Sequence, residues 1–183
     1  MENSFPQFLP IHNSQTAHPK GHNMTVYIDS APYPEVNGGP DPETVAMLKD
    51  DYAGAKGELT AITQYVYQSG RSTDNDAFAN SLLQIAIVEM THLDMLGDAI
   101  VTLGGNPRFD DGHYYWNASN TNYASDIKEM LKANISAEKH AIESYTKHAE
   151  LTKNPSVKAL LERIAKDEKL HLRFFTETLE SLK

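Results

Sequence analysis

Two nine-residue segments of the sequence share the pattern I-A-x-x-E-x-x-H-L, at residues 85–93 and 164–172. In each, a histidine follows a glutamate by three positions, and the pairs are Glu89–His92 and Glu168–His171. On an α-helix, side chains three positions apart lie on the same side, about 4.5 Å apart along the axis. The apolar residues of the pattern put that side against a core, where a charge is tolerated only when it is paired or bound to a metal. The chain must therefore form at least two helices with a carboxylate and an imidazole on their buried sides.

A second repeat extends this duplication. Residues 58–65 and 138–145 both read E-x-x-A-I-x-x-Y. This repeat is offset by 80 positions (58 to 138), and the first one by 79 (89 to 168), which indicates two similar pairs of helices. Helices with a single glutamate thus alternate with helices that carry Glu-x-x-His. That alternation is typical of carboxylate-bridged dinuclear metal sites in four-helix bundles.

Six side chains are the predicted metal ligands: Glu58, Glu89, His92, Glu138, Glu168 and His171. Two divalent cations would neutralise the four carboxylates, which would otherwise have to bind protons because of desolvation and mutual repulsion. Oxygen and nitrogen donors without sulfur suit iron or manganese. We therefore expect two metal ions per subunit, iron or manganese, bridged by Glu89 and Glu168. The alternative is a metal-free core of Glu–His pairs, in which the acids would outnumber their partners.

Two tyrosines accompany the single glutamates. Tyr65 and Tyr145 each follow one of these glutamates by seven positions, which is about two turns along the same helix face. We predict that they act in catalysis, by orienting a ligand or relaying an electron; the alternative is two amphipathic core residues. Two further histidines lie nearby in the same predicted helix. His140 lies about 200° round the helix from Glu138 and is expected to face away. His148 is expected to contact a ligand, pack in the core or face solvent.

Apolar periodicity and end signals predict four long helices. The first runs from Asp41-Pro42 to Ser69-Gly70, the second from about residues 72–74 to 103, the third from 125–126, and the fourth from Asn154-Pro155. A connection of about twenty residues separates the second from the third, long enough to travel the length of a bundle. Its aromatic residues, Tyr114, Tyr115 and Trp116, are expected to pack against helices or a second subunit. The prediction is an all-α four-helix bundle with one long crossover connection, over residues 41–183.

Residues 1–40 differ from the rest of the chain. Seven of the nine prolines fall at or before Pro42, and no helical period is present. We expect an extended N-terminal arm that lies on its own bundle or on a neighbour, with one short strand at residues 24–28. Three histidines of the arm are expected to be solvated or packing residues: His12, His18 and His22.

The composition of the chain argues against several classes of function. A formal charge of −9 argues against nucleic-acid binding. The absence of cysteine excludes thiolate zinc sites, iron–sulfur clusters and disulfides. No apolar run approaches the roughly 18 residues of a transmembrane helix, and the N-terminus lacks the features of a signal peptide. We expect a cytoplasmic protein that does not bind membranes.

The ligand helices resemble those of the ferritin-like superfamily, and within it the manganese catalases and rubrerythrins. The resemblance covers about residues 41–183, and the segment 114–131 also resembles small spore-coat and ferritin-like proteins related to manganese catalases. It implies a ferritin-like fold, a di-iron or di-manganese centre, hydrogen peroxide or dioxygen as substrate, and a homo-oligomer. The function expected is that of a dinuclear oxidoreductase acting on hydrogen peroxide, catalase-like or peroxidase-like. The alternative is a ferroxidase or iron-binding protein.

The sequence also departs from these families. Rubrerythrins carry a cysteine-ligated rubredoxin domain, so a peroxidase cycle here would need an external electron donor. Manganese catalases carry an arginine just before the glutamate of their third helix, and the residue at that position here is Ala137.

Overall fold

The computed structural model describes residues 27–182. In this part of the chain, five α-helices and one short 3-10 helix, η2 (Ala118–Asn120), are present. The α-helices are α1 (Pro42–Ala53), α2 (Glu58–Arg71), α3 (Asp76–Thr102), α4 (Ile127–Leu151) and α5 (Pro155–Ser181). No helix among these residues is long and apolar enough to cross a membrane.

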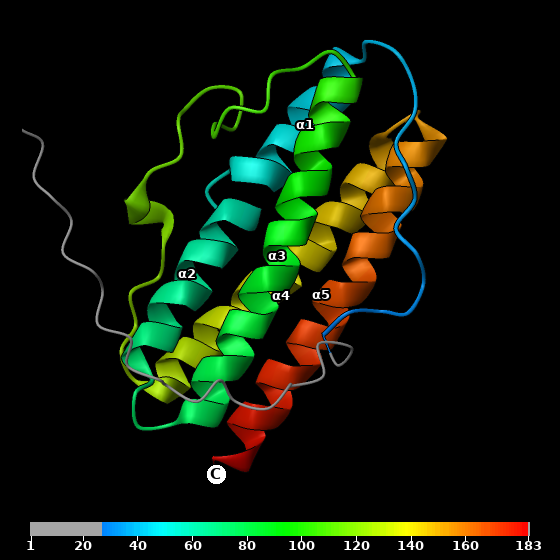
Figure 1. Ribbon diagram of the computed structural model, residues 1–183. Coiled ribbons are helices and arrows are strands. Elements are labelled where there is room, and N and C mark those ends of the chain that lie inside the picture. The colour runs from blue at the N-terminus through cyan, green and yellow to red at the C-terminus, as the bar shows by residue number, and fades with distance from the viewer. Residues whose placement is uncertain (1–26, 183) are drawn as a thin grey trace, which may run out of the picture.

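The helices form one bundle, in which α1 and α2 together make up the first of four rods (Figure 1). A short link turns the chain from α2 into the antiparallel α3. The connection from 103 to 126 then travels back along the bundle, so that α4 runs in the same direction as α3 (Figure 1). Helix α2 packs along α3, and α4 along α5. The predicted all-α bundle with one long crossover is confirmed.

The first rod is broken, so the prediction of one continuous helix from 41 to 70 is wrong. Gly54 and Gly57 flank the break. A Cβ atom on Gly57 would lie 2.4 Å from the carbonyl oxygen of Asp51, which no other residue could accommodate. The apolar period continues in register across the break, and for this reason periodicity alone did not reveal it. The break places Glu58 in the first turn of α2, where the helix dipole favours a negative charge.

Side-chain caps fix where the other helices begin. Each of four residues accepts a hydrogen bond from a backbone N–H group in the first turn of the following helix: Asp41, Asn75, Asp126 and Asn154. The predicted starts near 41, 125–126 and 154–155 are confirmed. Helix α3 begins at Asp76, slightly later than predicted.

Two apolar clusters enclose the middle of the bundle. One contains Leu96 and Ile164 together with the buried apolar residues of α1. The other contains Ile85 and Phe175 and lies toward the opposite end of the rods. Along α3 and α5, the Glu-x-x-His pairs fall between residues of these two clusters. The core thus has an apolar–polar–apolar order along its length, and the polar layer holds the predicted ligands.

Residues 27–41 run as an extended segment beside α5 (Figure 1). The guanidinium of Arg163 donates from Nε to the carbonyl of Ala31 at 2.6 Å and from Nη2 to that of Asp29 at 2.7 Å. Arg163 also lies 2.8 Å from Asp167 and 4.0 Å from the ring centre of Tyr33. This part of the predicted arm therefore lies on its own bundle. It contains no strand, and the other residues of the proposed strand, like the three arm histidines, lie outside the described residues.

The aromatic residues of the crossover divide into two kinds. Trp116 packs against the bundle and donates from Nε1 to Thr60 Oγ1 at 2.9 Å. Tyr114 and Tyr115 are instead 78% and 70% exposed. The expectation that the aromatic residues pack on helices thus holds for Trp116; contact of the two tyrosines with a second subunit stays a prediction.

Replacing Arg163 by leucine should destabilise the protein. The side chain is 4% exposed, and its loss leaves two carbonyls without their donor and removes the cation beside the buried carboxylate of Asp167. We expect the free energy of unfolding in urea to fall by about 3 kcal/mol. Lys158→Leu on the same helix is the control. Lys158 forms an exposed pair with Glu162 at 3.9 Å, so this substitution should change stability by less than about 0.5 kcal/mol. Equal effects of the two substitutions would contradict the role given to Arg163.

Candidate metal centre

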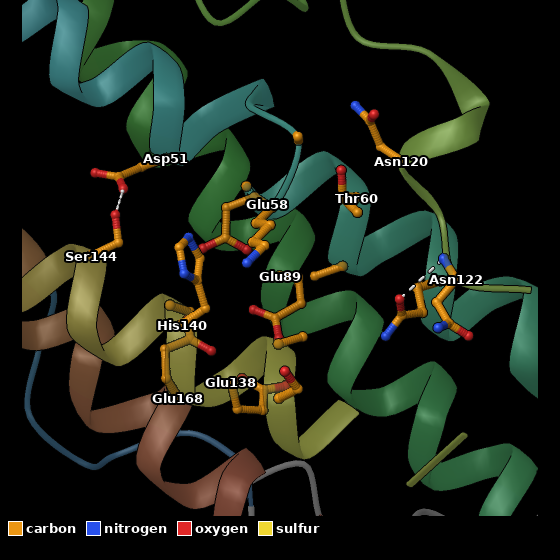
Figure 2. A pocket seen from close by; sticks show the side chains of 18 of the residues that line it. Asp51, Glu58, Thr60, Glu89, Asn120, Asn122, Glu138, His140, Ser144 and Glu168 are labelled. Atoms are coloured by element: carbon orange, nitrogen blue, oxygen red, sulfur yellow. Dashed lines mark hydrogen bonds between the residues drawn. The ribbon is translucent and has the colours of Figure 1, made fainter. Parts of the chain in front are cut away.

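The six residues predicted as ligands come together in the polar layer of the bundle. They are contributed by α2, α3, α4 and α5, and each is at most 4% exposed. Figure 2 shows the four glutamates gathered between these helices. The helical spacing of the two repeats therefore predicted a real cluster.

The cluster divides into two overlapping groups of four. Glu58, Glu89, His92 and Glu168 form one group, and Glu89, Glu138, Glu168 and His171 form the other. In each group, one ligand atom per residue lies within 4.8 Å of all the others. Glu89 and Glu168 belong to both groups, which is the arrangement expected of bridging ligands. Each group adds one further glutamate and one histidine of its own.

Both histidines turn Nδ1 toward the shared carboxylates. His92 Nδ1 lies 2.9 Å from Glu89 and 3.1 Å from Glu168. His171 Nδ1 lies 3.0 Å from Glu89 and 3.3 Å from Glu168. The two imidazoles therefore face the same pair of glutamates.

The opposite nitrogens of the two rings are held from outside the cluster. His92 Nε2 lies 3.1 Å from Asp167 Oδ2, and His171 Nε2 lies 3.0 Å from the carbonyl oxygen of Tyr27. A carbonyl can only accept, so His171 carries its proton on Nε2, and a carboxylate favours the same tautomer in His92. Each Nδ1 is then left with a lone pair for a cation.

Sequence reasoning did not identify Asp167 as part of the site. Its carboxylate also accepts from Tyr33 Oη at 2.5 Å and from the backbone N–H of Asp29 at 2.6 Å. Burial opposes its ionisation, but the hydrogen bonds from His92, Asp29, Tyr33 and Arg163 outweigh burial and lower the pKa of Asp167. The available signal was the residue before each repeated glutamate, which is valine in the first copy and aspartate in the second.

The two tyrosines connect the halves of the site. Tyr145 donates from Oη to Glu58, and Tyr65 donates from Oη to Glu138. Each tyrosine therefore holds the glutamate of the other repeat rather than the one on its own helix. Burial first, and the neighbouring glutamates second, raise the pKa of both phenols well above the usual value, so both stay protonated donors. This geometry supports ligand orientation, and because a buried tyrosine of the core also needs an acceptor for its hydroxyl, the catalytic role of the two tyrosines stays a prediction.

Without a metal, the charges of this layer are balanced by protons. Burial, followed by repulsion from Glu89 and Glu168 respectively, raises the pKa of Glu58 and Glu138 well above the usual value. Burial opposes protonation of His92 and His171, but the surrounding carboxylates outweigh it and raise the pKa of both imidazoles. The chain alone thus holds extra protons in the places where a cation would otherwise lie.

Two oxygens of the cluster are better placed to bind a cation than to accept a hydrogen bond. Among the described residues, Glu89 Oε1 and Glu168 Oε1 are buried side-chain oxygens that form no hydrogen bond. A histidine nitrogen lies 3.0 Å and 3.1 Å from them, respectively, but not in hydrogen-bonding geometry. Buried oxygens without a donor are rare, and these two belong to the glutamates that both groups share. The donor set and these two oxygens therefore fit a pair of metal ions.

A cavity of about 230 Å³ reaches the cluster from the flank of α4. All four glutamates line it, together with Tyr65 and Tyr145, and Asn120 and Asn122 of the crossover also border it (Figure 2). Small side chains of α4, among them Ala137 and Ala141, leave this space open. His140 lines the cavity too, so the expectation that it faces away is wrong: the cavity extends from the core face of α4, which carries Glu138, onto the flank that carries His140. A small molecule such as hydrogen peroxide fits this space.

His148 lies outside the cluster. It is 8% exposed, and its Nδ1 lies 2.7 Å from Oδ2 of Asp51, a buried residue of α1 that sequence reasoning did not single out. Of the expectations for His148, core packing is the one the structure supports. No periodic signal pointed to Asp51, because its partners lie on α4, more than ninety positions away.

Comparison with known proteins agrees with this geometry. The model of the family described as "Ferritin-like domain" matches residues 54–183. The chain is 24% identical over 165 residues to a probable manganese catalase from Clostridium acetobutylicum, covering 78% of this chain and 73% of that protein. It is 25% identical over 182 residues to protein CotJC from Bacillus subtilis, covering 87% and 95%.

Solved structures give the same picture. KatB, a manganese catalase from Anabaena, is 30% identical and superposes with a TM-score of 0.76, covering 84% of this chain and 79% of that one. The bacterioferritin BfrA from Mycobacterium tuberculosis is 23% identical, with a TM-score of 0.66, covering 80% and 88%. The second likeness concerns the fold alone.

The metal-free protein should become less stable as the pH rises above about 6.5. The folded-state pKa values of His92 and His171 are raised, so their contribution is complete below the unfolded value and is lost as the pH rises through the folded one. The pKa values of Glu58 and Glu138 are also raised, so these two groups likewise lower the stability of the metal-free protein as the pH rises. We expect urea unfolding of chelator-treated protein to show a falling free energy from pH 6.5 to 8.5.

Bound metal should reverse this trend, because protons compete with metal at every ligand and the loaded protein then loses stability on acidification. His148, whose pKa is also raised, adds to the metal-free trend. The comparison is therefore repeated in a His148→Gln background. A metal-free stability that stays level or rises between these pH values would contradict the charge balance described above.

Proposed function

Because the chain belongs to the ferritin-like domain family, whose model matches residues 54–183, we propose that its buried cluster binds two iron or manganese ions and acts on hydrogen peroxide. The observation that carries the proposal is the pair of overlapping ligand groups that share Glu89 and Glu168. The manganese catalases among the similar proteins support peroxide as the substrate.

The ligands divide symmetrically in this proposal. Glu58 and His92 would hold one metal, and Glu138 and His171 the other, with Glu89 and Glu168 bridging. Four carboxylates and two neutral imidazoles offset the charge of two divalent cations. Because the donors are oxygen and nitrogen, the set suits iron and manganese alike.

The residues around the ligands have separate tasks. When bound, the metal pair supplies a two-electron exchange with peroxide. Tyr65 and Tyr145 orient the two outer glutamates, while Asp167 and the carbonyl of Tyr27 hold the imidazole rings. The cavity admits a molecule of the size of peroxide beside the glutamates.

Oxygen release distinguishes the two peroxide activities. A catalase disproportionates peroxide to water and oxygen without a reductant, whereas a peroxidase consumes a reductant and releases no oxygen. The sequence contains no cysteine, so a peroxidase cycle would take electrons from an external donor. Protein loaded with manganese, and separately with iron, is mixed with peroxide in an oxygen-electrode cell. We expect oxygen release without reductant; peroxide consumption only with reductant identifies a peroxidase, and no consumption in either case rules out the proposal.

Iron oxidation is the second candidate, because the same donor set, free of sulfur, suits iron(II) and the cavity also admits dioxygen. A ferroxidase would consume dioxygen when iron(II) is added, in the absence of peroxide. Many irons retained per subunit would indicate storage, and about two would indicate a resident centre.

The ligand assignment is tested by metal content. Glu89→Gln removes a bridging carboxylate and should leave less than one metal per subunit, because glutamine cannot balance the cation charge. Glu143→Gln removes an exposed carboxylate on α4 and should keep two metals. His92→Ala and His171→Ala should each lose about one. Elemental analysis after dialysis gives the metal content, and two metals per subunit in the Glu89 variant would refute the assignment.

A further inference from the structure

The duplication allows the surroundings of the two halves to be compared. With the offset of 80 positions, Ser144 corresponds to Gln64 and His148 to Gln68. In both halves, the two side chains of the pair bind one residue from another helix. The bonding pattern is therefore repeated, but the chemical groups are not.

In the first half, the groups are neutral amides. Gln64 Nε2 donates to Asn134 Oδ1 at 2.8 Å, and Asn134 Nδ2 donates to Gln68 Oε1 at 2.8 Å. Gln68 and Asn134 are 0% exposed. Amides neither gain nor lose protons near neutral pH, so this end of the site cannot pass a proton by titration of its side chains.

In the second half, the central residue is a carboxylate. Ser144 Oγ donates to Asp51 Oδ1 at 2.7 Å, and His148 Nδ1 lies 2.7 Å from Asp51 Oδ2 (Figure 2 shows the serine bond). Burial raises the pKa of Asp51 although His148 opposes the effect. The hydrogen bond to Asp51 raises the pKa of His148. The contact of 2.7 Å therefore joins two groups that can each carry a proton.

The position of this pair connects the cavity with the outside. Asp51 and Ser144 line the cavity, and the four glutamates lie along the same cavity. The side chain of His148 is 10% exposed. The imidazole therefore lies at the boundary between solvent and Asp51, and Asp51 lies between the imidazole and the cavity.

Other charged groups face the pair from both helices. The charge of Asp50 of α1 contributes to raising the pKa of both Asp51 and His148. Lys147 of α4 opposes the raised pKa of His148, and Asp51 contributes to the raised pKa of the Tyr145 phenol. His140 and Lys56 border the same cavity. None of these forms a hydrogen bond to Asp51 in the described structure, where Ser144 and His148 hold its two oxygens.

We propose that His148 and Asp51 form a proton relay between solvent and the cavity, and that it serves the half of the site that contains Glu58 and Tyr145. The proposal rests on the peroxide function proposed above. Oxidation of one peroxide, H2O2 → O2 + 2 H+ + 2 e−, releases two protons, and reduction of another, H2O2 + 2 H+ + 2 e− → 2 H2O, consumes two. The two electrons would be held between the half-reactions by the metal pair that the ligand groups would bind. The relay accepts a proton at Asp51 in the first half-reaction, passes it to or from solvent through His148, and returns one in the second.

The relay is tested by replacing its two titratable side chains with the neutral amides found in the other half of the site. His148→Gln introduces the side chain found at the corresponding Gln68, and Asp51→Asn introduces the one found at Asn134. Each should keep two metals per subunit while oxygen release at neutral pH falls about 10²-fold. The activity should no longer follow the titration of His148 seen by NMR in the unaltered protein, and added small buffer acids should partly restore it. Gln68→Met is the matched control and should keep both the rate and the pH profile.

A second readout needs no peroxide. After a jump from pH 7.5 to pH 5 in the presence of a coloured chelator, protons must enter the buried layer before metal leaves. His148→Gln and Asp51→Asn should slow release of one of the two metals about 10-fold or more, and Gln68→Met should not. Unchanged release together with an unchanged pH profile in the fully loaded variants overturns the relay. Slowed release in a protein that consumes no peroxide leaves the relay standing and rejects the peroxide function.

Discussion

The burial of four carboxylates and two imidazoles in one layer is the constraint on which the structure depends. Removing an ionised group from water costs several kcal/mol even after the protein relaxes. The chain offsets this cost in several ways. The phenols of two tyrosines donate to the outer glutamates, and Glu58 lies in the first turn of a helix. Within the part of the chain that the structure describes, these local contacts still leave two glutamate oxygens without a donor, and a pair of cations is the partner that we propose for them.

The polar layer also dictates how the rods are packed. Apolar clusters close it above and below, and the cavity beside α4 gives small molecules a route to it. Residues 27–41 cover the α5 side, where the carbonyl of Tyr27 and the backbone N–H of Asp29 bind His171 and Asp167. An extended segment suits this task because its backbone groups are not used within a helix. The backbone of residues 27–41 thus helps to position side chains of the site.

Sequence reasoning succeeded where the chemistry is local to a helix. The spacing of Glu89 and His92 fixes their relation on one turn, and the repeat supplies the matching pair, so the cluster followed from periodicity. The break between α1 and α2 did not follow, because the apolar register continues across it. Asp51 and Asp167 were missed for a different reason: their partners come from distant segments, and a single acidic residue carries no period. Side chains that orient ligands from other helices depend on tertiary packing.

The two halves of the site have the same types of ligand but differ in the groups around these ligands. His92 is backed by the carboxylate of Asp167, whereas His171 is backed by a neutral carbonyl. A carboxylate behind an imidazole makes it a stronger donor than a carbonyl does. Asp51, a buried acidic residue that lines the cavity, also lies on the half that contains Glu58. Arg163 and His148 offset the charges of these two acids. A ligand set that is symmetric by duplication therefore lies in an asymmetric field. If the two proposals hold, the half with Glu58 and His92 would both bind its metal more tightly and exchange protons.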